Sequence, residues 1–363
     1  MMPDVSHLDP GAARRVLMTA SCRDSDALPK VANAGQVLLH AGRPVQVMHN
    51  GLLIDEGCYY GPWMTEIIKG LAGHHEPQEE VVFDAIIRRL VASPGPAEPW
   101  IIEFGSFWAY YSMWFCTALP GAHALAMEPD PVYLEVGRRN AELNGLADRI
   151  EFVHGAVGEN AGQFMEFRTE STGDVVPVLQ YDLRSLLDKA GVSAIQLAMV
   201  DIQGAETVML DRAQELLRAG AVRFLVVSTH HQEISSDALT HQRALDVLRD
   251  CGAHIIAEHT VRESYSGDGL IAAAFDSADR DVEVAISHAR AKESLFGEPE
   301  YELAALSTEL QEKTRLLAAS VSAEVALRAE VDDLRRELDK ARAASKPSVT
   351  GLIPRSLRGG RGQ

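Results

Sequence analysis

Between about residues 97 and 275, short apolar runs alternate with segments of helical periodicity. The apolar runs predict strands at 100–104, 122–127, 150–153, 195–200, 223–228, 254–258 and 270–275. The segments between them predict helices at 108–119, 132–143, 205–219 and 239–251. This alternation is typical of an α/β fold, in which a mostly parallel sheet carries helices on both faces. Ligands of such sheets bind beyond the carboxyl ends of the strands, so those ends are where functional residues are expected.

The segments on either side of this core, which we place at 96–276, differ in pattern. Residues 1–95 form an N-terminal extension with an amphipathic helix expected over 79–91, and a linker helix is expected over 277–300. Two polar segments of the extension, 59–62 (Tyr-Tyr-Gly-Pro) and 74–78 (His-His-Glu-Pro-Gln), read as loops. They predict either a lid that closes over a small-molecule site or an ordinary packing extension.

Residues 301–343 follow a heptad pattern and predict a coiled coil. Most of the core positions over 303–341 are apolar, among them Leu303, Leu310, Leu327, Leu334 and Leu338. The pattern favours a homo-oligomer, and the alternative is one amphipathic helix folded back on the globular part. Residues 344–363 are rich in Gly and Ser and carry Lys and Arg without any acid, which predicts a disordered basic tail. Its charge suits a peripheral contact with anionic lipid or an acidic partner.

Composition narrows the class of protein. The formal net charge of −18 disfavours binding to nucleic acid, because phosphate contacts need clustered Lys and Arg. The four cysteines lie far apart, which argues against a disulfide framework or a structural zinc site built from cysteines. The N-terminus lacks the pattern of a signal peptide, and no apolar run is long enough to span a membrane. We therefore expect a cytoplasmic protein, associated with a membrane only through its tail.

The first two predicted strands end in residues suited to a nucleoside cofactor. Glu103 ends the first strand, and Gly105 and Ser106 follow it just before a helix. The glycine lets a ligand approach the backbone, and the helix start offers free N–H groups. The GxGxxG fingerprint is absent, which argues against a nucleotide-sugar oxidoreductase that uses NAD. Glu128 ends the second strand, and a carboxylate there accepts hydrogen bonds from both ribose hydroxyls.

The fourth and fifth predicted strands end in residues suited to proton transfer. Asp201 follows one strand, and His230 and His231 follow the other. Adjacent histidines point in opposite directions in extended chain, so at most one of the two is expected to face a site. A histidine could act as base toward a hydroxyl, or Asp201 could ligate a divalent metal ion that lowers the pKa of that hydroxyl. The alternative is that these are solvent-facing polar residues at strand ends.

Several runs taken together resemble the FkbM-type methyltransferases. They are 103–112 (EFGSFWAYYS), 127–131 (MEPDP), 155–158 (GAVG), 181–183 (YDL) and, above all, 201–206 (DIQGAE). The resemblance spans roughly residues 97–275 and implies a class I, Rossmann-like methyltransferase fold that binds S-adenosylmethionine. It implies that Glu103 and Gly105 line the methionine part of the cofactor, that Glu128 binds the ribose, and that Ala156 lies near the adenine. The chain departs from the family pattern at Glu103, Phe107 and Ala109, where Asp, Asn and Gly are usual.

The resemblance also suggests a reaction, since family members commonly methylate hydroxyls of sugars or natural products. Methyltransferases that act on nitrogen in nucleic acids or amides would carry an Asn/Asp-Pro-Pro-Tyr/Phe-like segment after the fourth strand, and this chain has Asp-Ile-Gln-Gly at 201–204. We therefore expect an O-methyltransferase whose substrate is a small molecule or glycan. The alternative is a non-catalytic scaffold in which the coiled coil is the working part.

Overall fold

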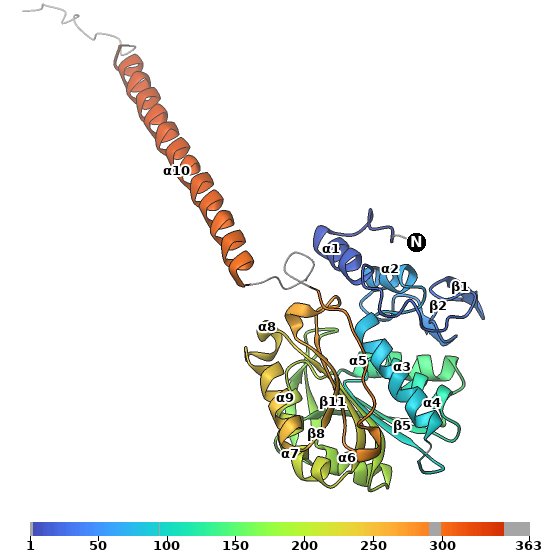
Figure 1. Ribbon diagram of the computed structural model, residues 1–363. Helices are drawn as coiled ribbons and strands as arrows, with labels where there is room; N and C mark the ends of the chain where they lie inside the picture. The colour runs from blue at the N-terminus through green and yellow to red at the C-terminus, as the bar shows by residue number, and fades with distance from the viewer. Residues whose placement is uncertain (1–2, 94, 290–298, 345–363) are drawn as a thin grey trace, which may run out of the picture. The chain divides into compact units, whose positions relative to one another are not determined.

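The computed structural model describes residues 3–93, 95–289 and 299–344, and the chain divides into two units, Met1–Glu298 and Pro299–Gln363. The first unit is built around a nine-stranded sheet (Figure 1). Its strands are β4 (Trp100–Phe104), β5 (His123–Glu128), β6 (Ile150–Val157), β7 (Phe164–Arg168), β8 (Val175–Tyr181), β9 (Ile195–Val200), β10 (Val222–Thr229), β11 (His254–His259) and β12 (Gly269–Ala274). All seven strands expected from the sequence are present, and β7 and β8 are additional.

The strand order is β11-β12-β10-β9-β4-β5-β6-β8-β7. The strands from β10 through β9, β4, β5 and β6 to β8 are parallel, whereas β12 runs antiparallel to both β10 and β11, and β7 antiparallel to β8. Chain order reverses at β4, which pairs with β5 on one side and with β9 on the other. This is the topological switch point, where open α/β sheets bind their ligands.

Helices cover both faces of the sheet (Figure 1). One buried cluster joins α3 (Pro77–Ala92), α4 (Tyr110–Ala118) and α5 (Pro131–Leu143) to one face, and a second joins α6 (Leu183–Ala190), α7 (Glu206–Arg218) and α9 (Thr240–Asp250) to the other. Successive strand residues alternate between the clusters: Ile101 packs in the first and Ile102 in the second. Both are fully buried, which explains why the strands read as continuous apolar runs.

The N-terminal region is folded onto the first of these faces. It contains α1 (Pro10–Thr19), a small antiparallel sheet of β1 (Val37–His40), β2 (Arg43–Val47) and β3 (Leu53–Asp55), and α2 (Pro62–Gly70). Strand β3 is fixed to α5 because Asn144 accepts a hydrogen bond from Leu53 N–H (2.9 Å) and donates one to its carbonyl (2.7 Å). The region therefore shares the core of the sheet domain.

The structure corrects the expected helix over 277–300. The short helix α8 (Gln232–Ser235) and the 3-10 turns η1 (Val261–Glu263) and η2 (Ser277–Asp279) complete the elements of the first unit, and η2 is followed by extended chain to residue 289. Residues 290–298 lie outside the described part. The Asp279 side chain of η2 points inward, where it bonds to Arg223 Nε (2.7 Å) and Arg89 Nε (2.8 Å).

We expect Asp279→Asn to destabilise the protein by about 3 kcal/mol, because it leaves two guanidinium groups without their buried counter-ion. Burial opposes ionisation of Asp279, but its bonds to Arg223 and Arg89 outweigh that effect and lower its pKa. A lowered folded-state pKa gives stability that is present above the unfolded pKa and is lost as the pH falls through the folded one. Urea unfolding at neutral and acidic pH measures both effects. The control is Asp281→Asn, an exposed partner of Arg89 that should change little; equal losses would contradict the prediction.

The second unit is described by one helix, α10 (Pro299–Ala344). It spans the predicted heptads as one uninterrupted helix, and the apolar core positions are exposed, with Leu310 66% and Leu334 58% accessible. The predicted tail lies beyond the described residues, apart from Ala344 at the end of the helix. Among the helices described, none combines the length and the apolarity needed to cross a membrane.

Candidate active site

A cavity of about 560 Å³ lies at the carboxyl edge of the sheet, around the switch point. All five residues proposed from the sequence for cofactor binding line it, namely Glu103, Gly105, Ser106, Glu128 and Ala156, and so does Asp201. They meet because β4, β5, β6 and β9 are neighbours whose carboxyl ends lie at one edge. The volume suits a drug-sized or nucleoside-sized ligand.

Glu103 is held inside the protein at the end of β4. It is almost fully buried, and its Oε2 accepts hydrogen bonds from Ser112 N–H (3.0 Å) and from the Ser112 hydroxyl on α4. Burial raises the pKa of Glu103 to about 8, against the opposing effect of the Ser112 bonds. A carboxyl group in this state gains most from a nearby cation, which would favour its ionised form.

Gly105 allows the turn after β4 to pass close to the turn after β9. Its φ is +77°, and a Cβ at this position would lie 1.7 Å from the carbonyl oxygen of Asp201. The N–H groups of Gly105 and Ser106 both donate to Met127 O (2.9 Å each), which fixes the turn against β5. Ser106 Oγ is buried and has no hydrogen-bond partner among the described residues, so it is available to a ligand.

Glu128 organises the same turn from the end of β5. Its Oε2 accepts a hydrogen bond from Phe107 N–H (3.0 Å), and its Oε1 accepts one from Asp130 N–H (2.9 Å). Each oxygen keeps acceptor capacity for a ribose hydroxyl. Burial raises the pKa of Glu128 to about 7, although the two backbone bonds oppose the rise.

The bulky residues that replace the usual family pattern are packed into an aromatic wall. Phe107 stacks on Tyr133 (centroids 3.6 Å apart), and Trp108 stacks on Tyr59 of the N-terminal region (4.5 Å). Tyr59, Tyr60 and His75 line the cavity, so the two segments expected to act as a lid do contribute to its wall. That these segments move as a lid stays a prediction. The bulky side chains of Phe107 and Trp108 line the cavity and do not fill it.

Asp201 and His230 come together across the ends of β9 and β10. His230 Nε2 lies 3.2 Å from Asp201 Oδ1 and 3.7 Å from Asp268 Oδ1, while Nδ1 bonds to Glu206 Oε1 at 2.7 Å. Burial opposes protonation of His230, but these three carboxylates outweigh it and raise its pKa well above the ordinary value. His231 is separate from this group, because it begins α8, where its Nδ1 accepts a hydrogen bond from Glu233 N–H (3.4 Å).

A second cavity, of about 440 Å³, adjoins the first and shares Tyr59, Tyr60, His75 and Asp201 with it. Its lining is acidic: Asp9, Glu76, Glu170, Asp201 and Asp268 face one guanidinium group, that of Arg15. Among the described carboxylates, Asp201 and Glu170 line both cavities, whereas His230 lines neither. Of these two carboxylates, Asp201 is the one that contacts His230, at 3.2 Å.

Sequence reasoning missed two carboxylates of this site. Glu206 is fully buried at the start of α7, and it lies within the 201–206 signature that carried the family resemblance. That position was the signal that could have identified it. Asp268 precedes β12, and nothing in the local sequence marks it. It reaches the site only because β12 runs antiparallel beside β10, which brings its first residues next to the end of β10.

Comparison with known proteins assigns this fold and site to the class of the methyltransferases. Residues 98–255 match the methyltransferase FkbM domain, which confirms the resemblance read from the sequence. The predicted α/β fold with its class I methyltransferase sheet is confirmed as well.

Individual relatives are distant. Over 114 residues the chain is 31% identical to the release factor glutamine methyltransferase of Chlorobaculum tepidum, a stretch that is 31% of this chain and 36% of that protein. The chain thus spans about a third of the length of this curated relative. Among solved structures, the METTL16 methyltransferase domain gives a TM-score of 0.37 at 16% identity, covering 55% of this chain and 69% of that one. Magnesium protoporphyrin IX methyltransferase (ChlM) from Synechocystis PCC 6803 with bound SAM gives 0.36 at 11%, covering 54% and 79%.

Proposed function

We propose that the protein is an S-adenosylmethionine-dependent O-methyltransferase that acts on a hydroxyl group of a sugar, glycan or natural product. The observation that carries the proposal is the position of Asp201, which lines both the cavity at the switch point and the acidic cavity beside it. The first cavity would hold the cofactor and the second the acceptor. Asp201 would then stand between the two reactants.

The residues of the first cavity fit this cofactor. Glu103 and Glu128 are buried carboxyls whose raised pKa values indicate that they lack a compensating cation, and the cofactor carries positive charge on its sulfonium and its amino group. Glu128 would accept the ribose hydroxyls, Ser106 Oγ and the turn at Gly105 would contact the methionine part, and Ala156 would lie near the adenine. When bound, the cofactor would supply an electrophilic methyl group, whose carbon an oxygen lone pair attacks while the thioether of S-adenosylhomocysteine leaves.

The chain's own contribution would be positioning and proton removal. Asp201 would accept the proton of the acceptor hydroxyl, because it lines both cavities whereas His230 and Glu206 line neither. His230 would orient Asp201, and Glu206 would in turn orient His230 through Nδ1. The aromatic wall of Tyr59, Phe107 and Trp108 would exclude water from the reacting groups.

A divalent ion is a second way to remove the proton, and the donor set fits one. Asp201 Oδ1 and His230 Nε2 are buried and lie 3.2 Å apart, and neither has a further hydrogen-bond partner among the described residues. Glu206 fixes the other nitrogen of His230, as carboxylates commonly do behind metal-bound histidines. Asp201 and His230 would then be ligands of an ion that lowers the pKa of the acceptor hydroxyl. Loss of activity in EDTA, restored by Mg²⁺ or Mn²⁺, would favour this arrangement over direct proton transfer to Asp201.

Two features support oxygen as the acceptor atom. The segment after β9 is Asp-Ile-Gln-Gly (201–204) rather than the Pro-Pro segment expected for amide or base nitrogen. The second cavity is lined by carboxylates, which accept hydrogen bonds from the several hydroxyls of a sugar-like molecule. Labelled S-adenosylmethionine incubated with a panel of glycans and hydroxylated natural products tests the assignment. Label found only on nitrogen or carbon would refute it.

Cofactor binding is tested separately by calorimetric titration with S-adenosylhomocysteine. We expect Glu128→Gln to weaken binding at least about tenfold, which corresponds to about 1.4 kcal/mol, because an amide offers one acceptor oxygen where the ribose and two backbone N–H groups need two. Glu151→Gln, on the exposed side of β6, is the matched control and should bind like the wild type. If the wild-type protein takes up no ligand at all, the non-catalytic scaffold becomes the better description.

The second unit would join two or more copies of the chain. Most heptad core positions of α10 are apolar, and these are exposed along the described part of the helix. Exposed apolar stripes of this kind are covered by a partner helix in coiled coils. We expect sedimentation equilibrium to give an oligomer for the full chain and a monomer for a chain truncated after residue 298. An oligomer that survives truncation would place the interface elsewhere.

A further inference from the structure

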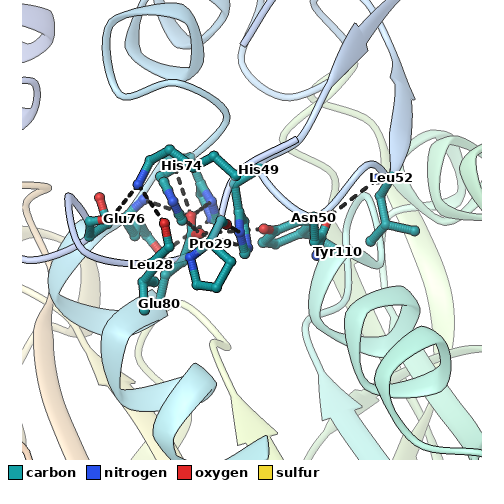
Figure 2. A network of polar contacts seen from close by, with 12 residues as sticks. Leu28, Pro29, His49, Asn50, Leu52, His74, Glu76, Glu80 and Tyr110 are labelled. Atoms are coloured by element: carbon teal, nitrogen blue, oxygen red, sulfur yellow. Dashed lines mark hydrogen bonds and ion pairs between the residues drawn. The ribbon is translucent and has the colours of Figure 1, made fainter. Parts of the chain in front are cut away.

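A second cluster of ionisable side chains lies in the N-terminal region (Figure 2). Its members are His49, which follows β2, His74 and His75, which precede α3, and Glu80 in the first turns of α3. All four are at most 3% exposed, although they belong to residue types that are seldom buried without a partner. The function proposed above does not use this cluster.

Glu80 is the centre of the cluster, and it acts only as an acceptor. Its Oε1 accepts from His75 Nδ1 (2.6 Å) and from His75 N–H (2.7 Å), and its Oε2 contacts His74 Nδ1 at 2.5 Å and accepts from the Tyr110 hydroxyl at 3.3 Å. Burial opposes ionisation of Glu80, but the interactions with His74 and His75 outweigh it and lower its pKa, which favours the ionised form. The protein has therefore buried a negative charge, and such a charge requires a cation.

The tautomer of His49 is determined by its surroundings. Its Nδ1 lies 3.1 Å from the carbonyl oxygen of Pro29, which can only accept, so Nδ1 carries the proton. His49 Nε2 therefore presents a lone pair, and it faces Glu80 Oε2 at 3.8 Å. Two acceptors face each other across this gap inside the protein, with no donor between them among the described residues. A positive ion bound here would satisfy both acceptors and supply the counter-charge of Glu80.

His74 completes a possible ligand set. Its ring stacks on His49 with centroids 4.0 Å apart and an interplanar angle of 18°, and its Nε2 is also buried without a partner in the described structure. One ligand atom from each of His49, His74 and Glu80 lies within 4.8 Å of the others. Two ligands of one tetrahedral zinc ion are roughly 3.3 Å apart. Because an imidazole binds a metal in the plane of its ring, one of the two stacked rings would turn to bring these atoms onto a common ion.

We propose that His49, His74 and Glu80 bind a structural Zn²⁺ ion inside the N-terminal region. Two imidazoles and one carboxylate would supply three of the four ligands of a tetrahedral zinc ion, and a water molecule would supply the fourth. The Pro29 carbonyl behind His49 is the kind of outer contact that orients metal-bound histidines. The ion would join the segment after β2 to the start of α3. It would thereby fix His75, which bonds to Glu80 and lines both cavities of the candidate active site. The proposal does not depend on the methyl-transfer reaction.

The experiment is metal analysis of the purified full chain, stripped with a chelator and then reloaded with Zn²⁺, combined with anomalous diffraction at the zinc edge. We expect about one tightly bound equivalent, an anomalous peak between His49 and Glu80, and a melting temperature that rises on reloading. His49→Ala and the near-isosteric Glu80→Gln should each weaken zinc binding at least roughly tenfold. His40→Ala, an exposed histidine of β1, should not.

Asp201→Asn separates this site from an ion at the candidate active site, because it should keep the zinc equivalent described here. Several results would overturn the proposal: folded wild-type protein that takes up no zinc, zinc retained equally by His49→Ala and Glu80→Gln, or an anomalous peak located only at Asp201. In the first case a proton shared among the histidines would supply the missing charge. Because wild-type protein alone can give that result, the test does not depend on whether the variants fold.

Discussion

Replacing Gly105 with alanine is expected to abolish binding of S-adenosylhomocysteine and to destabilise the protein by more than about 4 kcal/mol. The added Cβ would lie 1.7 Å from the Asp201 carbonyl oxygen and 2.8 Å from its carbon, and both are backbone atoms that cannot move aside alone. The turns after β4 and β9 would have to separate, which would displace Glu103 and Asp201 from each other. Urea unfolding and calorimetric titration measure the two losses.

Gly191→Ala is the matched control for this prediction. Gly191 ends α6 with a φ of +70°, close to that of Gly105, but a Cβ there would meet nothing within 4 Å. It should cost only about 1 kcal/mol, the strain of a left-handed alanine, and leave ligand binding intact. If the two variants lose similar stability, the close approach of the two turns has no energetic weight and the prediction is wrong.

Asp201→Asn should lower kcat for methyl transfer by about 10²- to 10⁴-fold and leave the affinity for S-adenosylhomocysteine unchanged. The amide keeps the size of the side chain but cannot take a proton or serve as an anionic ligand. The nearest cofactor carboxyls, Glu103 and Glu128, have their own hydrogen bonds and do not depend on Asp201. Radiolabel transfer to an acceptor found in the glycan panel gives the rate.

His231→Ala serves as the control, because His231 caps α8 whereas its neighbour His230 faces Asp201. The variant should retain the wild-type rate. A full rate in Asp201→Asn would exclude Asp201 from proton removal. Loss of ligand binding in that variant would instead assign Asp201 to the cofactor site.

The meeting of the strand ends could be predicted from the sequence, because parallel strands have their carboxyl ends at the same edge of a sheet. Once apolar runs identified the strands, Glu103, Glu128 and Asp201 had to share one edge. The choice between His230 and His231 was not predictable, because it depends on where β10 stops, and element ends are set by tertiary contacts. Asp268 was hidden for a similar reason, since only the antiparallel pairing of β12 places it beside β10.

The missed strands share a different cause. Strands β7 and β8 lie at the edge of the sheet with one face open to solvent, and Phe164 at the start of β7 is 72% exposed. Glu166 and Arg168 interrupt the apolar residues of β7, and Pro177, a residue that is rare inside strands, interrupts those of β8. The small sheet of β1 to β3 was missed because its strands are short, three to five residues each.

Because the N-terminal region packs onto the sheet, it belongs to the smallest domain that can be transferred to another protein. The part matched to the FkbM domain ends at residue 255, inside β11 and before β12, and begins after α3. Excising it would expose Phe115 and Trp114, which pack in one cluster with Phe83 and Ile86 of α3, and would remove Tyr59 from the cavity wall. Chimeras and minimal enzymes should therefore be cut outside residues 3 and 289, since a cut at the limits of sequence similarity would leave a sheet without its covering layer.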